Sequence, residues 1–282
     1  MRILLIRHGE MDKKSRETNQ KCLLSDRGKD QAERAAEIIK AFYEKEYGDR
    51  LTSGGVEGIA KNYVEKFIKN NPGSKPGSVK NVLDMMGGIL TEELKLGKPK
   101  IRLWQSPFAR ARQTAKAINE TLGNVILDTK EHVLLCEHQF GILYKSELAR
   151  GACSTASSAN YYADFNTACD LNGKFFVRYP FGESSLDVAM RIQNMINLFN
   201  VDAENEGIND LIVVCHGAVI CIFTMLLTGK TPEWYEEEET PGNCSIRLID
   251  NGKDCGYIFG GFKDGKAWEY RKLIKQGYLN NF

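Results

Sequence analysis

Two histidines lie at positions where side chains can do chemistry. His8 and His216, two of the four histidines in the chain, each follow a short apolar run and precede a glycine. The runs Ile3–Ile6 and Leu211–Val214 are typical of buried strands, and ligands of open α/β sheets bind beyond the carboxyl ends of strands. A neutral imidazole can act as a nucleophile, and a charged one can anchor an anion. A histidine that only packs at a strand end is the alternative interpretation of either residue.

Two arginines add the charge that a phosphoryl group requires. Arg7 directly precedes His8, and Arg110 follows Ser106 at the start of a predicted helix. A guanidinium matches phosphoryl oxygens in a bidentate way, so this pattern indicates phosphoryl-transfer chemistry. Arg112 is on the same helix but points in another direction, and it is predicted to be a solvated charge.

Short motifs follow one another along the chain. They are Arg7–Glu10 (RHGE), Leu24–Gly28 (LSDRG), Ser106–Ala115 (SPFARARQTA) and Cys215–Gly217 (CHG). Together they resemble the histidine phosphatase (phosphoglycerate mutase-like) superfamily, and the resemblance covers most of the chain apart from residues 45–100. It implies an α/β fold, a three-layer αβα sandwich with a mainly parallel central sheet.

Further stretches are similar to the eukaryotic mutase-like phosphatase branch of that superfamily. Glu137–Gly141 (EHQFG) and Arg178–Ser184 (RYPFGES) look like its E-Q-D-F-G and F-P-N-G-E-S, and Pro241–Arg247 (PGNCSIR) is also similar. Mutase members carry a stretch around the acid that resembles E-R-H-Y-G, from which Glu137–Gly141 departs. The resemblance therefore favours a phosphatase over a cofactor-dependent phosphoglycerate mutase. A non-catalytic scaffold with this fold is the third hypothesis, although degenerate members typically lose the nucleophile or an arginine.

The resemblance also implies a mechanism. His8 would attack phosphorus in line and form a phosphohistidine, while Arg7, Arg110 and His216 would bind the equatorial oxygens. Glu137 would protonate the leaving group and then deprotonate the water that cleaves the intermediate, a role that needs a raised pKa. Because arginine and histidine supply the positive charge, neither a metal ion nor an organic cofactor is expected.

Two more residues are predicted to contact the substrate. Asn243 is a candidate near the phosphate. Lys14 stands where many relatives carry a phosphate-binding asparagine, and either Lys14 or Asn19 is expected to replace that contact. The substrate is expected to be a small phosphorylated metabolite or a phosphoprotein, and whether the chain forms a homo-oligomer stays open.

Other residues of interest are expected to have structural roles. Ser106 and its proline should fix the entry of the helix that carries Arg110, while Glu183 and Ser184 should cap the helix that follows them and help order the site. His132 and His138 are predicted to be non-catalytic. The acidic run Glu236–Glu239 is predicted to be a solvated surface loop.

The chain is interpreted as one domain of residues 1–282, whose helices and strands are predicted from hydrophobic periodicity. Apolar spacing predicts helices at about Lys29–Glu44, Ala109–Leu122, Leu186–Phe199 and Ala218–Leu227. Strands are predicted at Met1–Ile6, Ile101–Trp104, Val125–Leu127, Leu211–Val214 and Ile246–Ile249, with Tyr257–Phe259 paired nearby. Residues 45–100 are rich in glycine and proline and are interpreted as an insertion, with helices around Val56–Ile68 and Val79–Met86. Tyr144, Tyr161, Tyr162 and Phe165 are candidates for the wall of the substrate pocket.

Composition excludes several other classes. The net charge of +1 gives no support for nucleic-acid binding. The uncharged stretch Leu211–Thr228 is interrupted by a His-Gly pair after its β-branched part, so we read it as a buried strand and helix and expect no membrane span. The eight cysteines form no C-x-x-C pair, which indicates reduced thiols in a cytoplasmic protein.

Overall fold

The computed structural model describes residues 1–12, 14, 18–48, 51, 68–70, 72, 98–141, 156–263 and 266–267. Most of the predicted insertion at 45–100, including both of its predicted helices apart from Ile68, lies outside the described residues. So do Tyr144 and the side chains of Tyr161 and Tyr162. Among the residues described, no helix is long and apolar enough to cross a membrane.

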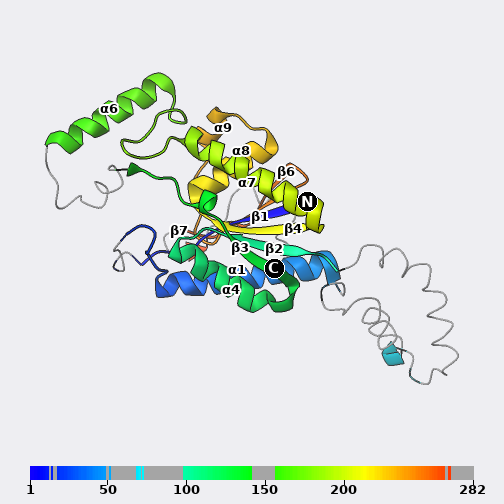
Figure 1. The fold of residues 1–282 in the computed structure, drawn as a ribbon. Helices are drawn as coiled ribbons and strands as arrows, with labels where there is room; N and C mark the ends of the chain where they lie inside the picture. Colours follow the sequence, from blue (N-terminus) through cyan, green and yellow to red (C-terminus); the bar gives the residue numbers. More distant parts are fainter. Residues whose placement is uncertain are drawn as a thin grey trace.

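A six-stranded mixed sheet forms the centre of the molecule (Figure 1). Its strands in chain order are β1 (Arg2–Arg7), β2 (Ile101–Gln105), β3 (Ile126–Glu131), β4 (Asp210–Cys215), β5 (Ile246–Asp250) and β6 (Lys253–Phe259). Their spatial order is β3-β2-β4-β1-β5-β6, with β3, β2, β4 and β1 parallel. The last two strands are antiparallel to their neighbours, as a tight turn between β5 and β6 requires. Strands β7 (Phe262–Lys263) and β8 (Lys266–Ala267) form a separate short hairpin.

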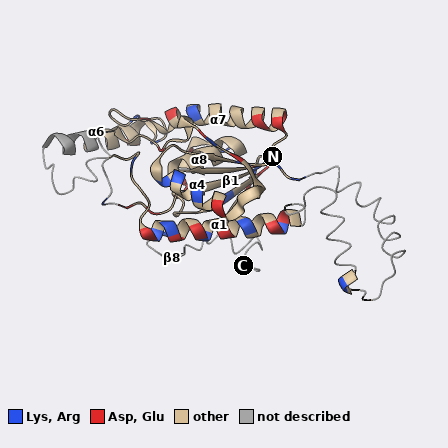
Figure 2. Ribbon diagram, turned by 60° about the horizontal axis from the view of Figure 1, so that its bottom comes forward, with Lys and Arg blue, Asp and Glu red and all other residues tan. Residues whose placement is uncertain are grey.

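Helices cover both faces of the sheet, so the predicted three-layer αβα sandwich is confirmed (Figures 1 and 2). Helices α1 (Asp26–Tyr47) and α4 (Ala109–Leu122) lie on one face, and α7 (Ser185–Glu206) and α8 (Gly217–Thr228) lie on the other. The remaining helical elements are η2 (Gly123–Val125), η3 (Val133–Leu135), α6 (Ala156–Asn172) and α9 (Pro232–Glu237). Helix α6 projects away from the sheet in Figure 1.

Alternation along β1 divides the core into two parts. Leu4 and Ile6 pack with α1 and α4, whereas Ile3 and Leu5 pack with α7 and α8. This is the period of two that a strand buried on both faces imposes. Helix α8 carries no charged residue and is buried along most of its length, while charged residues mark the outer face of α1 in Figure 2.

Capping side chains set where helices α1 and α7 start. Ser25 accepts a hydrogen bond from the N–H of Gly28 at 3.0 Å and begins α1. Ser184 and Asp187 form a reciprocal capping box that begins α7, which satisfies two backbone donors that the helix leaves open. The predicted cap at Ser184 is therefore confirmed.

Several sequence-based boundaries and one role need correction. Helices α1 and α7 extend beyond their predicted ends, to Tyr47 and Glu206, because polar residues continue the helix where apolar spacing stops. The interpretation of the acidic run Glu236–Glu239 as a solvated loop holds only in part, since Glu236, Glu237 and Glu239 are exposed. Its first half belongs to α9, and Glu238 is buried in an ion pair with Arg247 at 2.7 Å.

Candidate active site

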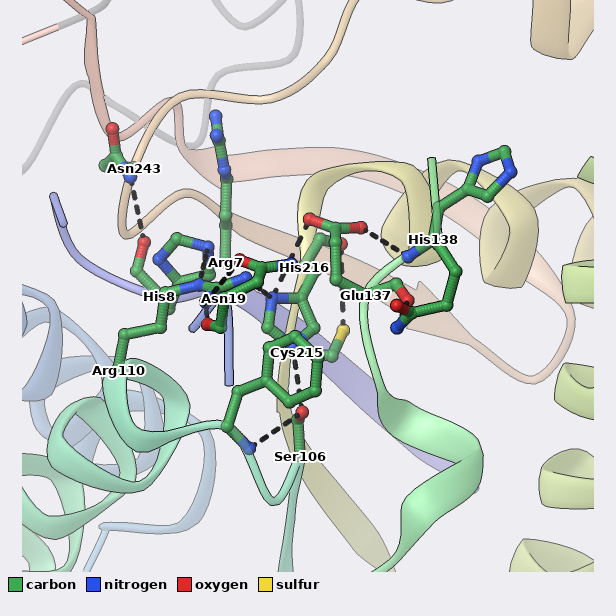
Figure 3. A network of polar contacts seen from close by, with 12 residues as sticks. Arg7, His8, Asn19, Ser106, Arg110, Glu137, His138, Cys215, His216 and Asn243 are labelled. Atoms are coloured by element: carbon green, nitrogen blue, oxygen red, sulfur yellow. Dashed lines mark hydrogen bonds and ion pairs between the residues drawn. The ribbon is translucent and has the colours of Figure 1, made fainter. Parts of the chain in front are cut away.

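Three polar residues lie at one edge of the sheet, each directly after the end of one of three neighbouring strands. Strand β1 ends before His8, β2 before Ser106 and β4 before His216. The backbone N–H of His8 donates to the carbonyl of Cys215 at 3.1 Å, and that of Ser106 donates to Val214 at 3.0 Å. These bonds continue the ladder by one residue beyond each strand, so the side chains converge (Figure 3). The two imidazole rings lie 5.1 Å apart, edge to face.

The hydrogen bonds of His8 fix its tautomer. Its Nδ1 lies 2.7 Å from the carbonyl oxygen of Gly9, which can only accept. Its Nε2 lies 3.0 Å from Nε of Arg110, which can only donate. The proton therefore sits on Nδ1 and the lone pair on Nε2. Burial, with the charges of Arg110 and Arg7, lowers the pKa of His8 well below its usual value, so the ring is neutral and nucleophilic.

His216 lies between a hydroxyl, a cation and a carboxylate. Its Nε2 is 2.8 Å from Oγ of Ser106, and its Nδ1 is 3.3 Å from a terminal nitrogen of Arg110 and 3.7 Å from the carboxylate of Glu137. Because the guanidinium only donates, Nδ1 is its acceptor and the proton sits on Nε2, facing Ser106. Burial, followed by the neighbouring His8 and Arg110, lowers the pKa of His216, so this ring is also neutral.

Arg110 ties the two histidines to the loop that follows β1. It is buried near the start of α4, and its third contact is a bond of 2.7 Å to the carbonyl of Asn19, whose side-chain oxygen also accepts at 3.2 Å. Lys14 of the same loop is exposed, and its backbone N–H donates to Asp12 at 2.8 Å. The structure thus brings Asn19 to the site and leaves Lys14 at the surface.

Arg7 is the second cation of the site. Its Nη1 donates to the carbonyl of Pro241 at 2.5 Å, while its buried Nε has no hydrogen-bond partner among the described residues. Burial lowers the pKa of Arg7, and Glu137 opposes that shift. A buried cationic donor without a protein acceptor fits an anion-binding site. Gly217 makes room for Thr240, since a Cβ on Gly217 would lie 2.6 Å from Cγ2 of Thr240, whereas its distance of 3.5 Å from Nε of Arg7 would be an ordinary contact.

Glu137 completes the group of reactive side chains. One carboxylate oxygen accepts from the backbone N–H of His138 at 3.0 Å, and the other faces His216. Burial raises the pKa of Glu137 against the effects of that hydrogen bond and of Arg110 and Arg7. A carboxyl group whose pKa is raised is suited to serve first as an acid and then as a base.

Close backbone packing holds the nucleophile loop. A Cβ on Gly9 would lie 2.4 Å from the carbonyl oxygen of Gly28, and one on Gly28 would lie 2.2 Å from that of Glu10. Only glycine lets the RHGE and LSDRG loops approach this closely. Glu10 then bonds to Ser25 at 3.2 Å and pairs with Arg27, which explains why the two motifs occur together.

Three other predicted residues have local roles. Asn243 donates from its side chain to the carbonyl of His8 at 3.1 Å, so it supports the nucleophile's backbone. His138 is buried against Phe140, and Nε2 of its ring bonds to the carbonyl of Glu183 at 2.9 Å. His132 caps η3 by accepting from a backbone N–H.

Arg112 and Phe165 are both engaged with neighbouring side chains. Arg112 forms an exposed ion pair with Glu131 at 2.6 Å, away from the histidines. Phe165 stacks on Tyr179 with the ring centroids 4.4 Å apart, which is an aromatic packing contact. Neither contact involves His8 or His216.

The same residues could be considered as a metal site. Ligand atoms of His8, Glu137 and His216 lie within 4.8 Å of one another. However, the guanidinium of Arg110 contacts a ring nitrogen of each histidine, and Arg7 adds a second positive charge. A divalent cation would have to displace one cation and bind beside another. The arrangement therefore favours an anion.

Sequence reasoning missed some residues that organise this site. Ser106 was assigned to the helix entry, but its hydroxyl contacts His216. Arg191 was also missed; it forms an ion pair of 2.9 Å, next to the Glu137 segment, with Glu183, a residue that the sequence does indicate as helping to order the site. Arg191 follows the G-E-S stretch on an amphipathic helix. The sequence signal available for it was an arginine placed among the apolar positions of that helix.

Comparisons with known proteins identify a family that the chain matches. The family model described as the histidine phosphatase superfamily (branch 1) matches residues 89–258, a segment that contains Arg110, Glu137 and His216. The phosphoglycerate mutase-like proteins AT74 and AT74H of Arabidopsis thaliana are each 24% identical, over 166 and 170 residues. These matches cover 56% and 57% of this chain and 48% and 55% of the relatives, so the chain spans about half the length of the relatives.

A third relative and two solved structures extend the comparison. A probable fructose-2,6-bisphosphatase of Schizosaccharomyces pombe is 28% identical over 46% of this chain and 27% of its own length. A mycobacterial glucosyl-3-phosphoglycerate phosphatase complexed with inorganic phosphate has a TM-score of 0.51 at 20% identity, covering 88% of this chain and 89% of its own. The α-ribazole phosphatase of Shigella flexneri has a TM-score of 0.52 at 16% identity, covering 89% and 90%. Both structures share the fold.

Proposed function

The chain belongs to the histidine phosphatase superfamily, and from that premise we propose that it hydrolyses phosphomonoesters through a covalent phosphohistidine on His8. The observation that carries the proposal is the fixed tautomer of His8. A backbone carbonyl holds the proton on Nδ1, and Nε2 presents its lone pair beside Arg110. An imidazole prepared in this way needs no further base to become a nucleophile.

The first step transfers the phosphoryl group to the enzyme. Nε2 of His8 bonds to phosphorus while the bond from phosphorus to the ester oxygen breaks, and Glu137 gives its proton to the departing oxygen. Arg110 and Arg7 stabilise the charge on the equatorial oxygens. His216 adds a third contact, because a bound phosphate dianion raises the pKa of the imidazole beside it and favours its protonated form.

The second step releases inorganic phosphate. Glu137, now a carboxylate, removes a proton from water, whose oxygen bonds to phosphorus as the bond from phosphorus to His8 breaks. His8 keeps its Nδ1 proton throughout, because the carbonyl of Gly9 holds it. We propose a small phosphorylated metabolite or a phosphoprotein as the substrate.

The experiment is a single-turnover reaction with an aryl phosphate, quenched and read by intact mass. The proposal expects a transient mass increase of one phosphoryl group on the wild-type chain and none on His8→Ala. His132→Ala is the matched control, because that ring contacts Trp104 and not His8 or His216. Net formation of phosphate with water distinguishes a phosphatase from a mutase, for which interconversion of 2- and 3-phosphoglycerate would be measured. Failure of the wild-type chain in both assays, with an intact fold, would leave the scaffold hypothesis.

A further inference from the structure

An ion pair between Glu183, which precedes the N-cap of α7, and Arg191 of α7 contacts the segment that carries Glu137. Nε of Arg191 lies 2.9 Å from one carboxylate oxygen of Glu183, and a terminal nitrogen lies 3.2 Å from the other. This is the bidentate geometry that a guanidinium forms with a carboxylate. Both side chains are largely buried, with 15% and 22% of their surfaces exposed. Solvent therefore screens the pair less than it would a surface ion pair.

The pair holds the backbone on both sides of the acid. Arg191 donates to the carbonyl of Leu134, before Glu137, and to the carbonyl of Glu137 itself at 3.3 Å. The carboxylate of Glu183 accepts from the backbone N–H of Gln139, after Glu137, at 3.0 Å. The backbone N–H of Glu183 also donates to the carbonyl of Gln139 at 2.8 Å. The two side chains of one ion pair thus bond to the backbone of one short segment at three residues, Leu134, Glu137 and Gln139.

The part of the fold that supports the Glu183–Arg191 pair is rigid. Ser184, which follows Glu183, is the N-cap of α7, and Ile192, which follows Arg191, is fully buried in the core. The two partners are therefore fixed to the helix by its cap and by its packing. The Glu137 segment has no helix or strand of its own beyond the short η3, so its position depends on side-chain bonds such as these.

From these contacts we infer that the Glu183–Arg191 pair is a positioning device for the carboxyl group of Glu137. The inference rests on the proposed function, in which that carboxyl transfers protons. It assigns neither residue a contact with substrate. The pair acts by fixing the backbone from which Glu137 reaches His216, and a shift of about 1 Å at a reacting group can reduce a rate by about 10²-fold.

The consequence is a dependence on the leaving group. Phenyl and alkyl phosphates release strongly basic oxygens that need a proton in the transition state, whereas a nitrophenyl phosphate releases a weakly basic one. Because kcat/KM reports the steps up to phosphohistidine formation, it registers this difference even if later steps limit kcat. A displaced acid lowers kcat/KM for the first class and leaves the second almost unchanged.

The test compares Arg191→Lys and Glu183→Gln with the wild-type chain on nitrophenyl, phenyl and alkyl phosphates. We expect kcat/KM for the alkyl ester to fall by about 10- to 100-fold and that for the nitrophenyl ester by less than about 3-fold. The double variant should lose no more than the worse single variant, since the pair acts as one unit. Arg178→Lys is the matched control, because Arg178 pairs with Asp187 on the same helix at 2.5 Å and is 64% exposed.

A second readout does not require turnover. Amide hydrogen exchange over residues 134–141 should become faster in Arg191→Lys and stay unchanged in Arg178→Lys. An equal loss on all three esters, or unchanged exchange, would overturn the positioning role. A wild-type chain inactive on every ester would instead refute the proposed function and, with it, the catalytic meaning of the pair.

Discussion

Replacing Arg110 by methionine tests the electrostatic core of the proposed mechanism. The Nε of Arg110 lies 3.0 Å from the atom of His8 that would bond to phosphorus. The attraction between a unit positive charge and one unit of phosphoryl charge about 4 Å away contributes about 4 kcal/mol at an effective dielectric constant of about 20. At about 1.4 kcal/mol per tenfold change, this corresponds to about 10³-fold in rate. We therefore expect kcat/KM of Arg110→Met to fall by about 10³-fold.

The pH profile gives a second signature of the same change. The charge of Arg110 contributes to the lowered pKa of His8. Without that charge the pKa of His8 rises towards its ordinary value, so protonation inactivates the nucleophile at a higher pH. The acid limb of kcat/KM should shift upward, which a loss of folding alone would not produce. Thermal denaturation of each variant verifies that the fold is retained.

Two variants make the assay decisive. Arg110→Lys keeps the charge but cannot reproduce the planar fork that joins His8, His216 and Asn19, so its loss should be intermediate. Arg112→Met removes an exposed arginine from the same helix and should change kcat/KM by less than about 2-fold, as expected for a surface ion pair. A loss below about 10-fold in Arg110→Met, or an unmoved acid limb, would show that the guanidinium does not act as argued.

Three further predictions follow from the geometry. Burial raises the pKa of Glu137, so Glu137→Gln should be more stable than the wild-type chain as pH rises through that raised pKa and equally stable below the unfolded pKa of about 4.3. Urea unfolding across pH measures the two stabilities. A difference in stability that is constant with pH would contradict the prediction. Gly28→Ala places a Cβ 2.2 Å from a backbone oxygen and should lower the free energy of unfolding by more than about 2 kcal/mol, whereas Gly229→Ala, with open space around its Cβ, should lower it by about 1 kcal/mol from backbone strain. Prolonged treatment with a chelator should leave the initial rate unchanged, and vanadate, which adopts five-coordinate geometry, should inhibit competitively. Loss of activity on chelation that zinc restores would contradict an anion site built from Arg7, Arg110 and the histidines.

The sheet edge could be predicted from the sequence because its signals are local. The apolar runs before His8 and His216 mark parallel strands, and parallel strands end at the same edge. The register of β1 with β4, which pairs Arg7 with Cys215, brings the two imidazoles together as expected. The mainly parallel sheet and its two helical layers follow from the same alternation of strand and helix patterns.

Contacts between distant side chains could not be predicted in this way. The bond between Ser106 and His216, and the one between Arg110 and Asn19, depend on the paths of loops. Loops carry no periodic pattern, so their sequence does not specify where they lie. In the acidic run Glu236–Glu239, the prediction of a solvated side chain fails only at Glu238, for a related reason. Its charge indicated solvent, but a buried arginine, Arg247, supplied the partner that makes burial possible.

The two halves of the reaction depend on different parts of the fold. The nucleophile is set by neighbours in the chain, since the carbonyl that fixes the tautomer of His8 belongs to the next residue, Gly9. The acid has both local and distant support, because the backbone N–H of the next residue, His138, bonds to the carboxylate of Glu137, and Arg191, on a helix far along the chain, bonds to the carbonyl of Glu137. Changes at Glu183 or Arg191 should therefore alter proton transfer while phosphoryl capture by His8 persists. A site organised in this way can change its preference among leaving groups without altering the strand end that carries its nucleophile.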